Sequence, residues 1–109
     1  MCIRDRDWGI PTATAVREAA ALRTPELPFT LIASGGITSA MDVARSIALG
    51  ADLAASARPM LKELKRGGRP ALERMLDGWI RDLRGIMFLT GARSIADLRT
   101  RPLVRRHQQ

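Results

Sequence analysis

The sequence has one cysteine, one histidine, no tyrosine and only 4% aromatic residues. A single thiol, Cys2, cannot form an internal disulfide framework, which excludes a small secreted disulfide scaffold. His107 is the one histidine, so a zinc site of cysteines and histidines and a Ser-His-Asp triad of the usual kind are both excluded. No apolar run approaches the roughly 20 residues that span a bilayer, so we expect no membrane partner.

The length of 109 residues and the mass of 12.0 kDa allow one domain at most. The hydrophobic share of 46% is ordinary for a globular protein and too high for a disordered one. The composition therefore indicates part or all of one folded domain.

The charge balance is basic, with 18 Lys and Arg against 11 Asp and Glu, a net charge of +7 and a pI near 11.4. Binding to nucleic acid needs clustered cations or aromatic rings that stack on bases. Here the cations are dispersed except in the last residues, and aromatic residues are scarce. We therefore expect no nucleic-acid partner, and keep a small basic nucleic-acid-binding protein as the alternative from another class.

The middle of the chain predicts a strand, a helix and a second strand in that order. Residues 29–34 form a near-continuous apolar run, which is typical of a strand buried on both faces of a parallel sheet. Thr38 or Ser39 can cap a helix that Gly50 ends, and residues 51–57 form the second strand. This unit is one βαβ motif of about 30 residues, so we expect an α/β fold.

Helices flank this unit on both sides. The first is rich in helix formers, and Thr12 or Thr14 can cap its start. After the second strand, the pair Gly67-Gly68 interrupts an apolar helical periodicity, which restarts at Pro70. The expected helices span residues 13–22, 58–66 and 70–89, with one short turn over residues 94–98.

Small residues follow both predicted strands. Gly35 and Gly36 lie between the first strand and its helix, where a backbone without Cβ atoms can approach a ligand. The start of a helix also presents unpaired N–H groups and a partial positive charge, which suit a phosphate. The second strand ends in the small residues Ala54 and Ala55. In βα barrels the loops after the last two strands often form a shared phosphate pocket, so both halves of such a pocket are predicted here.

Two parallel strands alone leave open edges and cannot bury their helices well, so the pattern predicts a piece of a larger sheet. The last turns of an eightfold βα barrel fit the pattern. Residues 1–6 are short, charged and aperiodic, and we interpret them as a leader that the gene does not encode. We therefore expect a C-terminal fragment with a domain over residues 7–98 and a basic tail over residues 99–109.

Four strings occur in the order and spacing of the type 2 isopentenyl-diphosphate isomerase family, which the chain resembles. They are Asp7-Trp8-Gly9-Ile10-Pro11-Thr12, Ile32-Ala33-Ser34-Gly35-Gly36-Ile37, Ala48-Leu49-Gly50-Ala51-Asp52 and Met87-Phe88-Leu89-Thr90-Gly91-Ala92. The family is an FMN-dependent βα barrel. The resemblance implies that residues 7–98 are the C-terminal portion of a (β/α)8 TIM barrel, with strands seven and eight and their flanking helices.

The resemblance also implies a function. The family interconverts isopentenyl diphosphate and dimethylallyl diphosphate with reduced FMN, with NADPH as reductant and Mg2+ on the diphosphate. The resemblance implies a cytoplasmic homo-oligomer whose metal-binding acid and diphosphate-binding basic residues lie on earlier strands, outside this chain. Thr38 stands where many members have Arg, and Ala55 where the family often has Gly. The implied FMN-phosphate residues are Gly35, Gly36, Ile37, Thr38, Ala54 and Ala55.

Other residues have simpler interpretations. Asp42 and Asp52 are expected to be cap and turn residues, Arg58 a solvated helix start and Trp79 a core residue. The arginines of the tail are expected to be solvated. A related FMN-dependent 2-hydroxy-acid oxidase or dehydrogenase shares the phosphate loops and remains the alternative enzyme, while the string at residues 8–12 favours the isomerase.

Overall fold

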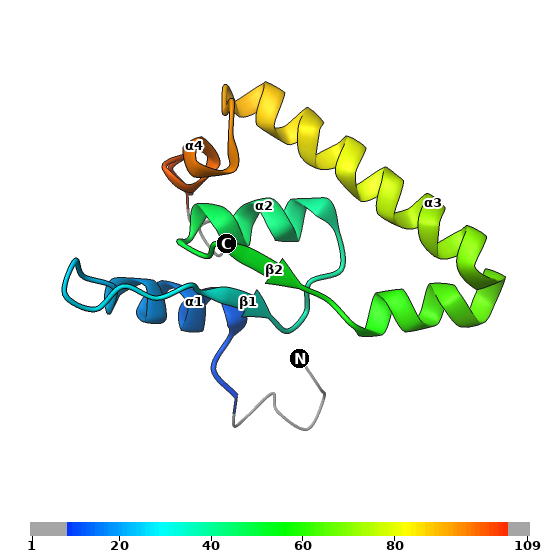
Figure 1. The fold of residues 1–109 in the computed structure, drawn as a ribbon, viewed down its shortest axis with the longest axis horizontal. Helices are drawn as coiled ribbons and strands as arrows, with labels where there is room; N and C mark the ends of the chain where they lie inside the picture. The colour runs from blue at the N-terminus through cyan, green and yellow to red at the C-terminus, as the bar shows by residue number, and fades with distance from the viewer. Residues whose placement is uncertain (1–8, 105–109) are drawn as a thin grey trace, which may run out of the picture.

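The computed structural model describes residues 9–104 of the 109-residue chain. Helices and strands alternate as the sequence predicts, which confirms the α/β class (Figure 1). The predicted leader (residues 1–6), Trp8 and the last tail residues (105–109) lie outside the described residues. The elements are α1 (Thr12–Ala21), β1 (Ile32–Ser34), α2 (Ala40–Ala48), β2 (Leu53–Ala55), α3 (Arg58–Thr90) and α4 (Ile95–Arg99).

β1 and β2 form a two-stranded parallel sheet in which Ala33 lies opposite Ala54, which confirms the βαβ unit. Both strands are shorter than the predicted ranges 29–34 and 51–57. The expected burial on both faces is wrong, because Ile32 and Leu53, which lie opposite each other, are each 55% exposed. No described segment covers that face, so only Ala33 on the other face is fully enclosed.

α1 begins at Thr12, after Pro11 in the N-cap position, and no side chain caps it. The expectation that Thr12 or Thr14 caps this helix is therefore wrong. The Thr12 hydroxyl instead donates a hydrogen bond to the carbonyl of Gly35, 2.8 Å away in the turn after β1. Pro11 has no N–H of its own to leave unpaired, but its ring accepts no hydrogen bond, so the first-turn amides of α1 have no side-chain cap.

α2 has the predicted cap, since the Ser39 hydroxyl accepts from the Asp42 amide at 3.2 Å. The Asp42 carboxylate accepts from the amide of Thr38, one residue before the position that a capping box uses. After α2, Gly50 has a φ of +122°, and a Cβ there would lie 2.6 Å from the Ala20 Cβ. Gly50 thus permits the close approach of α1 to the end of α2.

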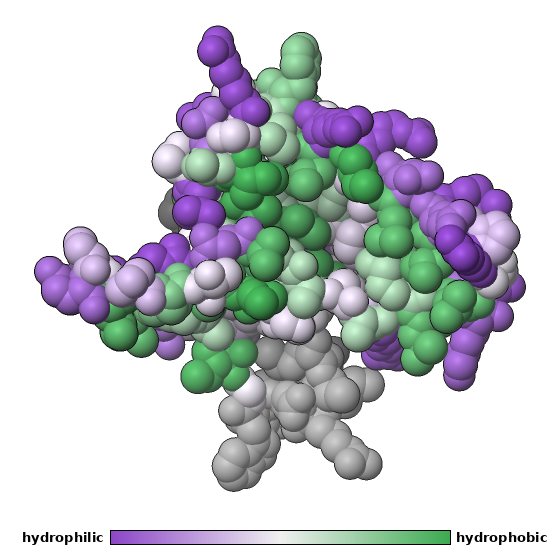
Figure 2. Space-filling model, viewed as in Figure 1, coloured by the Kyte–Doolittle hydropathy of each residue, from purple (hydrophilic) through white to green (hydrophobic). Residues whose placement is uncertain are grey.

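α3 consists of two parts that meet at a bend (Figure 1). Gly68 has φ 69° and ψ −166° at this bend, and Pro70 begins the second part, as predicted. Leu83, Ile86 and Met87 of the second part pack against the core of α2 and α4. Figure 2 shows apolar residues on the side of α3 that faces α2 and hydrophilic residues on its outer side.

α4 follows Gly91, which has a φ of 72°, and Ser94 caps it by accepting from the Asp97 amide at 3.1 Å. The expectation that Arg99 begins a solvated tail is wrong, because Arg99 is the last residue of α4 and pairs with Asp52. Arg101 also bonds to the chain, donating to the carbonyl of Gly91 at 2.7 Å. Within residues 9–104, no helix has both the length and the apolar character to cross a membrane.

Candidate functional site

A cavity of about 860 Å³ lies at the carboxyl ends of both strands. Five of the six predicted site residues line it, so the structure brings the two predicted loops together. The cavity also contains cationic residues at the start of α3. Its lining residues are Ser34, Gly35, Gly36, Ile37, Thr38, Ala55, Ser56, Ala57, Arg58, Pro59, Lys62, Glu63 and Met75.

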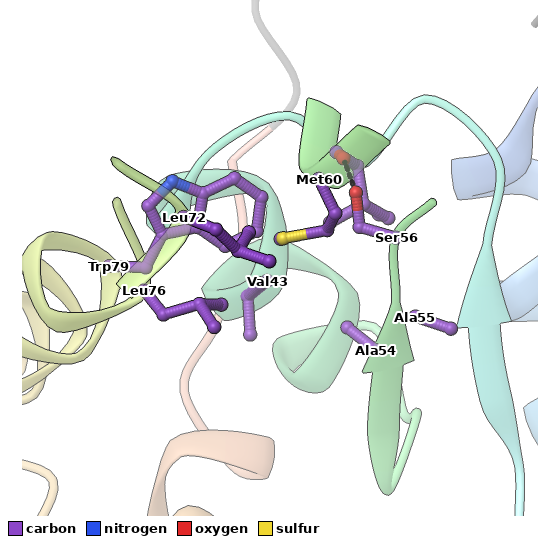
Figure 3. Close-up of a pocket in the computed structure, with 9 residues that line it drawn as sticks. Val43, Ala54, Ala55, Ser56, Met60, Leu72, Leu76 and Trp79 are labelled. Atoms are coloured by element: carbon purple, nitrogen blue, oxygen red, sulfur yellow. Dashed lines mark hydrogen bonds between the residues drawn. The ribbon is translucent and has the colours of Figure 1, made fainter. Parts of the chain in front are cut away.

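Ala54, the sixth predicted residue, lines a different cavity of about 510 Å³. Val43, Leu76 and Trp79 surround it there and make this second cavity largely apolar (Figure 3). Ile37, Ala55 and Ser56 line both cavities, so the two cavities are neighbours at the end of β2, and Ala54 reaches only the apolar one. Trp79 is half-buried on the wall of this cavity and is absent from the buried core, so the expectation that it is a core residue is wrong.

The turn after β1 has a backbone that favours glycine twice in succession. Gly35 has a φ of +101° and Gly36 a φ of +74°. A Cβ on Gly35 would lie 3.0 Å from the Thr12 hydroxyl oxygen, closer than most real Cβ contacts. The turn therefore requires glycine for its conformation at both positions, and for its approach to α1 at the first.

The predicted phosphate donor Thr38 already has a partner for both of its polar hydrogens. Its amide and its hydroxyl each donate to Asp42 Oδ2 at 3.0 Å. Partial burial raises the pKa of the Asp42 carboxyl, but the hydrogen bonds from Thr38 outweigh it and lower that pKa below its usual value. Asp42 is thus an ionised cap of α2, as the sequence indicated.

The start of α3 brings two cations to the cavity. Arg58 and Lys62 both line it, and their spacing of four residues is the one that aligns side chains on a helix. Glu63 also lines it, but its carboxylate pairs with Arg66, which lowers the pKa of Glu63. The positive charge of Arg58 and Lys62 therefore remains for a ligand.

Sequence reasoning placed Arg58 in solvent and gave no role to Lys62 or Ser56. The sequence could have indicated Ser56 and Arg58 as cavity residues, because both directly follow the second strand at the start of a helix. Ser56 donates a hydrogen bond from its hydroxyl to the carbonyl of Ile37 at 2.6 Å, which joins the two loops (Figure 3). This contact depends on the tertiary fold and has no local signal.

The cavity can hold an anion by three features together. It has backbone N–H groups in a glycine turn, the start of α3 on its wall, and the cations Arg58 and Lys62. Among residues 9–104, no group of three or more His, Cys, Asp or Glu side chains is arranged to hold a metal ion. The glycine turn and the two cations are features that suit an anionic group such as a phosphate.

Curated proteins of known name match the chain closely. A relative from Chlorobium luteolum, named isopentenyl-diphosphate delta-isomerase, is 52% identical over 101 residues, or 89% of this chain and 27% of the relative. A relative of the same name from Chlorobium phaeovibrioides is 54% identical over 99 residues, with the same coverage of 89% and 27%. One from Symbiobacterium thermophilum, also of that name, is 46% identical over 99 residues, or 91% of this chain and 27% of the relative.

The chain thus spans about 27% of the length of these curated relatives. The family model described as FMN-dependent dehydrogenase matches residues 4–106, nearly the whole chain. This match agrees with a glycine turn and a cationic helix start that meet at the carboxyl ends of two parallel strands. The chain belongs to the FMN-dependent dehydrogenase family.

Proposed function

We propose that this chain forms the FMN-phosphate site of an isomerase that interconverts isopentenyl diphosphate and dimethylallyl diphosphate. The names of the relatives, at about 50% identity along nearly the whole chain, support this activity. The observation that carries the proposal is the single cavity lined by the glycine turn, Ser56, Arg58 and Lys62. We assign no catalytic residue to this chain.

The residues of the cavity fit the phosphate of FMN. The positive φ values of Gly35 and Gly36 make a turn that is open to a close approach, since neither residue carries a Cβ. Arg58 and Lys62 would balance the phosphate charge, and the N–H groups of the turn would donate to its oxygens. When bound, reduced FMN supplies the proton transfer of the isomerisation, and this chain's residues hold its phosphate.

We further propose that β1 and β2 are strands seven and eight of a (β/α)8 barrel. The parallel pairing with α2 between the strands supports this placement. The exposure of Ile32 and Leu53 supports it too, because a third layer of structure would bury this face. The site at the carboxyl ends of the strands is where βα barrels bind their ligands.

The remaining expectations belong to the same proposal. NADPH would reduce the flavin, and Mg2+ would bind the substrate diphosphate through residues of the longer protein. That protein would be a cytoplasmic homo-oligomer. These features follow from the family resemblance alone, and the cavity of this chain is assigned only to the FMN phosphate.

An FMN-dependent 2-hydroxy-acid oxidase or dehydrogenase is the second candidate, and the name of the matching family model favours it. Both enzymes would use the same phosphate cavity, so the cavity does not distinguish them. The names of the relatives favour the isomerase. Substrate turnover therefore has to decide.

The test uses a reconstituted complex, defined as the full chain co-expressed with the Chlorobium luteolum relative from which the segment matching this chain has been removed. We expect the two parts to associate, to bind FMN and to convert isopentenyl diphosphate in the presence of NADPH and Mg2+. The relative's truncated part alone is the control and should be inactive. Failure to associate, or an FMN-loaded complex that oxidises 2-hydroxy acids and leaves isopentenyl diphosphate unchanged, would contradict the proposal.

A further inference from the structure

Two side-chain hydroxyls hold backbone carbonyls of the glycine turn. From α1, Thr12 Oγ1 donates to the carbonyl oxygen of Gly35 at 2.8 Å. From the segment between β2 and α3, Ser56 Oγ donates to the carbonyl oxygen of Ile37 at 2.6 Å (Figure 3). The turn is thus fixed by two elements that are distant from it in sequence.

The bond from Thr12 sets the direction of the Gly36 N–H. A trans peptide unit is planar, and its C=O and N–H point in opposite directions. The N–H of Gly36 shares its peptide unit with the Gly35 carbonyl and therefore points away from Thr12. This N–H has no hydrogen-bond partner among residues 9–104, and Gly36 lines the cavity.

The hydrogen bond from Ser56 holds the peptide unit between Ile37 and Thr38. The peptide unit between Ile37 and Thr38 is bound at both ends, at its carbonyl by Ser56 and at its N–H by Asp42 Oδ2 at 3.0 Å. This unit cannot rotate without losing two hydrogen bonds. The Ile37 N–H, in the unit between the two held ones, also has no partner within the described part of the chain.

We propose that Thr12 and Ser56 are positioning residues for FMN, an inference that rests on the proposed function. The two hydroxyls engage the carbonyl oxygens of Gly35 and Ile37 and so keep them off the phosphate. Thr12 thereby orients the Gly36 N–H, and the two held peptide units flank the unit that carries the Ile37 N–H, so that both N–H groups can donate to the phosphate. A carbonyl oxygen facing a phosphate would repel it, so the orientation of these peptide units determines phosphate affinity. Ser56 also fixes the distance between the two loops that line the cavity.

The test compares two flavins on the reconstituted complex. Riboflavin is FMN without its phosphate, so a residue that orients the phosphate donors affects FMN alone. Thr12→Val and Ser56→Ala each remove one hydroxyl. We expect each to raise the dissociation constant of FMN by about fivefold, the equivalent of one hydrogen bond, and to leave that of riboflavin within about twofold.

Conservative variants and a matched control accompany these substitutions. Thr12→Ser and Ser56→Thr retain the hydroxyl and should restore the FMN affinity. Ser46→Ala removes a hydroxyl that donates to the carbonyl of Asp42 at 2.8 Å inside α2 and does not line the cavity. This control should not change the preference for FMN over riboflavin, which flavin fluorescence titration measures.

Two outcomes would overturn the inference while the proposed function stands. One is an unchanged FMN dissociation constant in Thr12→Val and Ser56→Ala; the other is an equal loss of FMN and riboflavin affinity, which marks a general structural role. A third outcome is an unsubstituted complex that binds riboflavin as tightly as FMN. That result would show that the complex has no binding site for the FMN phosphate, and it would contradict both proposals.

Discussion

Arg99 Nη2 lies 2.6 Å from Asp52 Oδ1, and this ion pair joins the last helix to the residue that precedes β2. The other carboxylate oxygen of Asp52 accepts from Arg23 Nη2 at 2.7 Å and from the Leu31 amide at 2.8 Å. One aspartate therefore connects the end of α1, the start of β1 and α4. It does so at the amino ends of the strands, at the opposite end of the sheet from the phosphate cavity.

Asp52→Asn should destabilise the reconstituted complex without affecting FMN. The Asp52 side chain is 24% exposed, so we discount its ion pairs and expect a loss of about 1–2 kcal/mol in the free energy of unfolding. Urea denaturation measures this loss. Asp82→Asn, an exposed aspartate of α3 with no ion pair among the described residues, is the matched control.

The effect of Asp52→Asn should depend on pH with a definite sign. The hydrogen bond from the Leu31 amide, and then the charges of Arg99 and Arg23, lower the pKa of Asp52 below its ordinary value of 3.8. A lowered pKa in the folded state adds stability that is complete above 3.8 and is lost as the pH falls through the lowered pKa. The difference between the two proteins should thus be full at neutral pH and shrink below 3.8; a difference that grows with acid would contradict this account.

Gly36→Val should weaken FMN binding by about tenfold to a hundredfold. Valine does not adopt the φ of +74° at this position, and the loss of one backbone hydrogen bond to a charged phosphate has this magnitude. Gly85→Val is the matched control, because a Cβ at Gly85 meets nothing within 4 Å. Equal FMN affinity in the two folded variants, by fluorescence titration, would place the phosphate elsewhere.

Lys62→Met should reduce FMN affinity by about threefold at low ionic strength, with riboflavin unaffected, because a partly solvated charge contributes up to about 1 kcal/mol. Lys65→Met is the control, since Lys65 lies on the same helix and does not line the cavity. High salt should erase the difference between the two variants. A loss that is independent of salt would mean that Lys62 acts through packing.

The isolated chain should bind an apolar dye and show no isomerase activity. Ile32 and Leu53 form an exposed apolar pair on the sheet, and the buried core consists mainly of small residues, so the chain alone gains little from burial. We expect a broad thermal transition and dye fluorescence that falls when the reconstituted complex forms. A sharp, cooperative transition of a monomer without dye binding would show instead that the chain is an independent domain.

Local signals predicted the order of the elements and several of their ends. The Ser39 cap and the bend at Gly68 with the restart at Pro70 are each encoded within a few residues, and both are confirmed. The two loops that line the cavity were predicted for the same reason, because each directly follows a strand.

The features that the sequence did not predict depend on contacts between residues that are distant in the chain. The pairing of Arg99 with Asp52 and the bonds of Thr12 and Ser56 to the glycine turn arise only when the elements pack together. The placement of Ala54 in the apolar cavity follows from which face of β2 turns toward α3, and the small residues of this strand give no alternation that fixes the face. Strand lengths were overestimated because pairing with a neighbour, and not apolarity, determines where a strand ends.

NMR of the backbone amides of Gly36 and Ile37 tests directly whether this turn binds the FMN phosphate, in a reconstituted complex in which only this chain carries ¹⁵N. Saturating FMN should shift both amide signals strongly, as expected for N–H groups that donate to a phosphate. Riboflavin, which lacks the phosphate, should shift them little. Equal shifts with the two flavins, or no shift with FMN while it is bound, would contradict the assignment of this turn to the FMN phosphate.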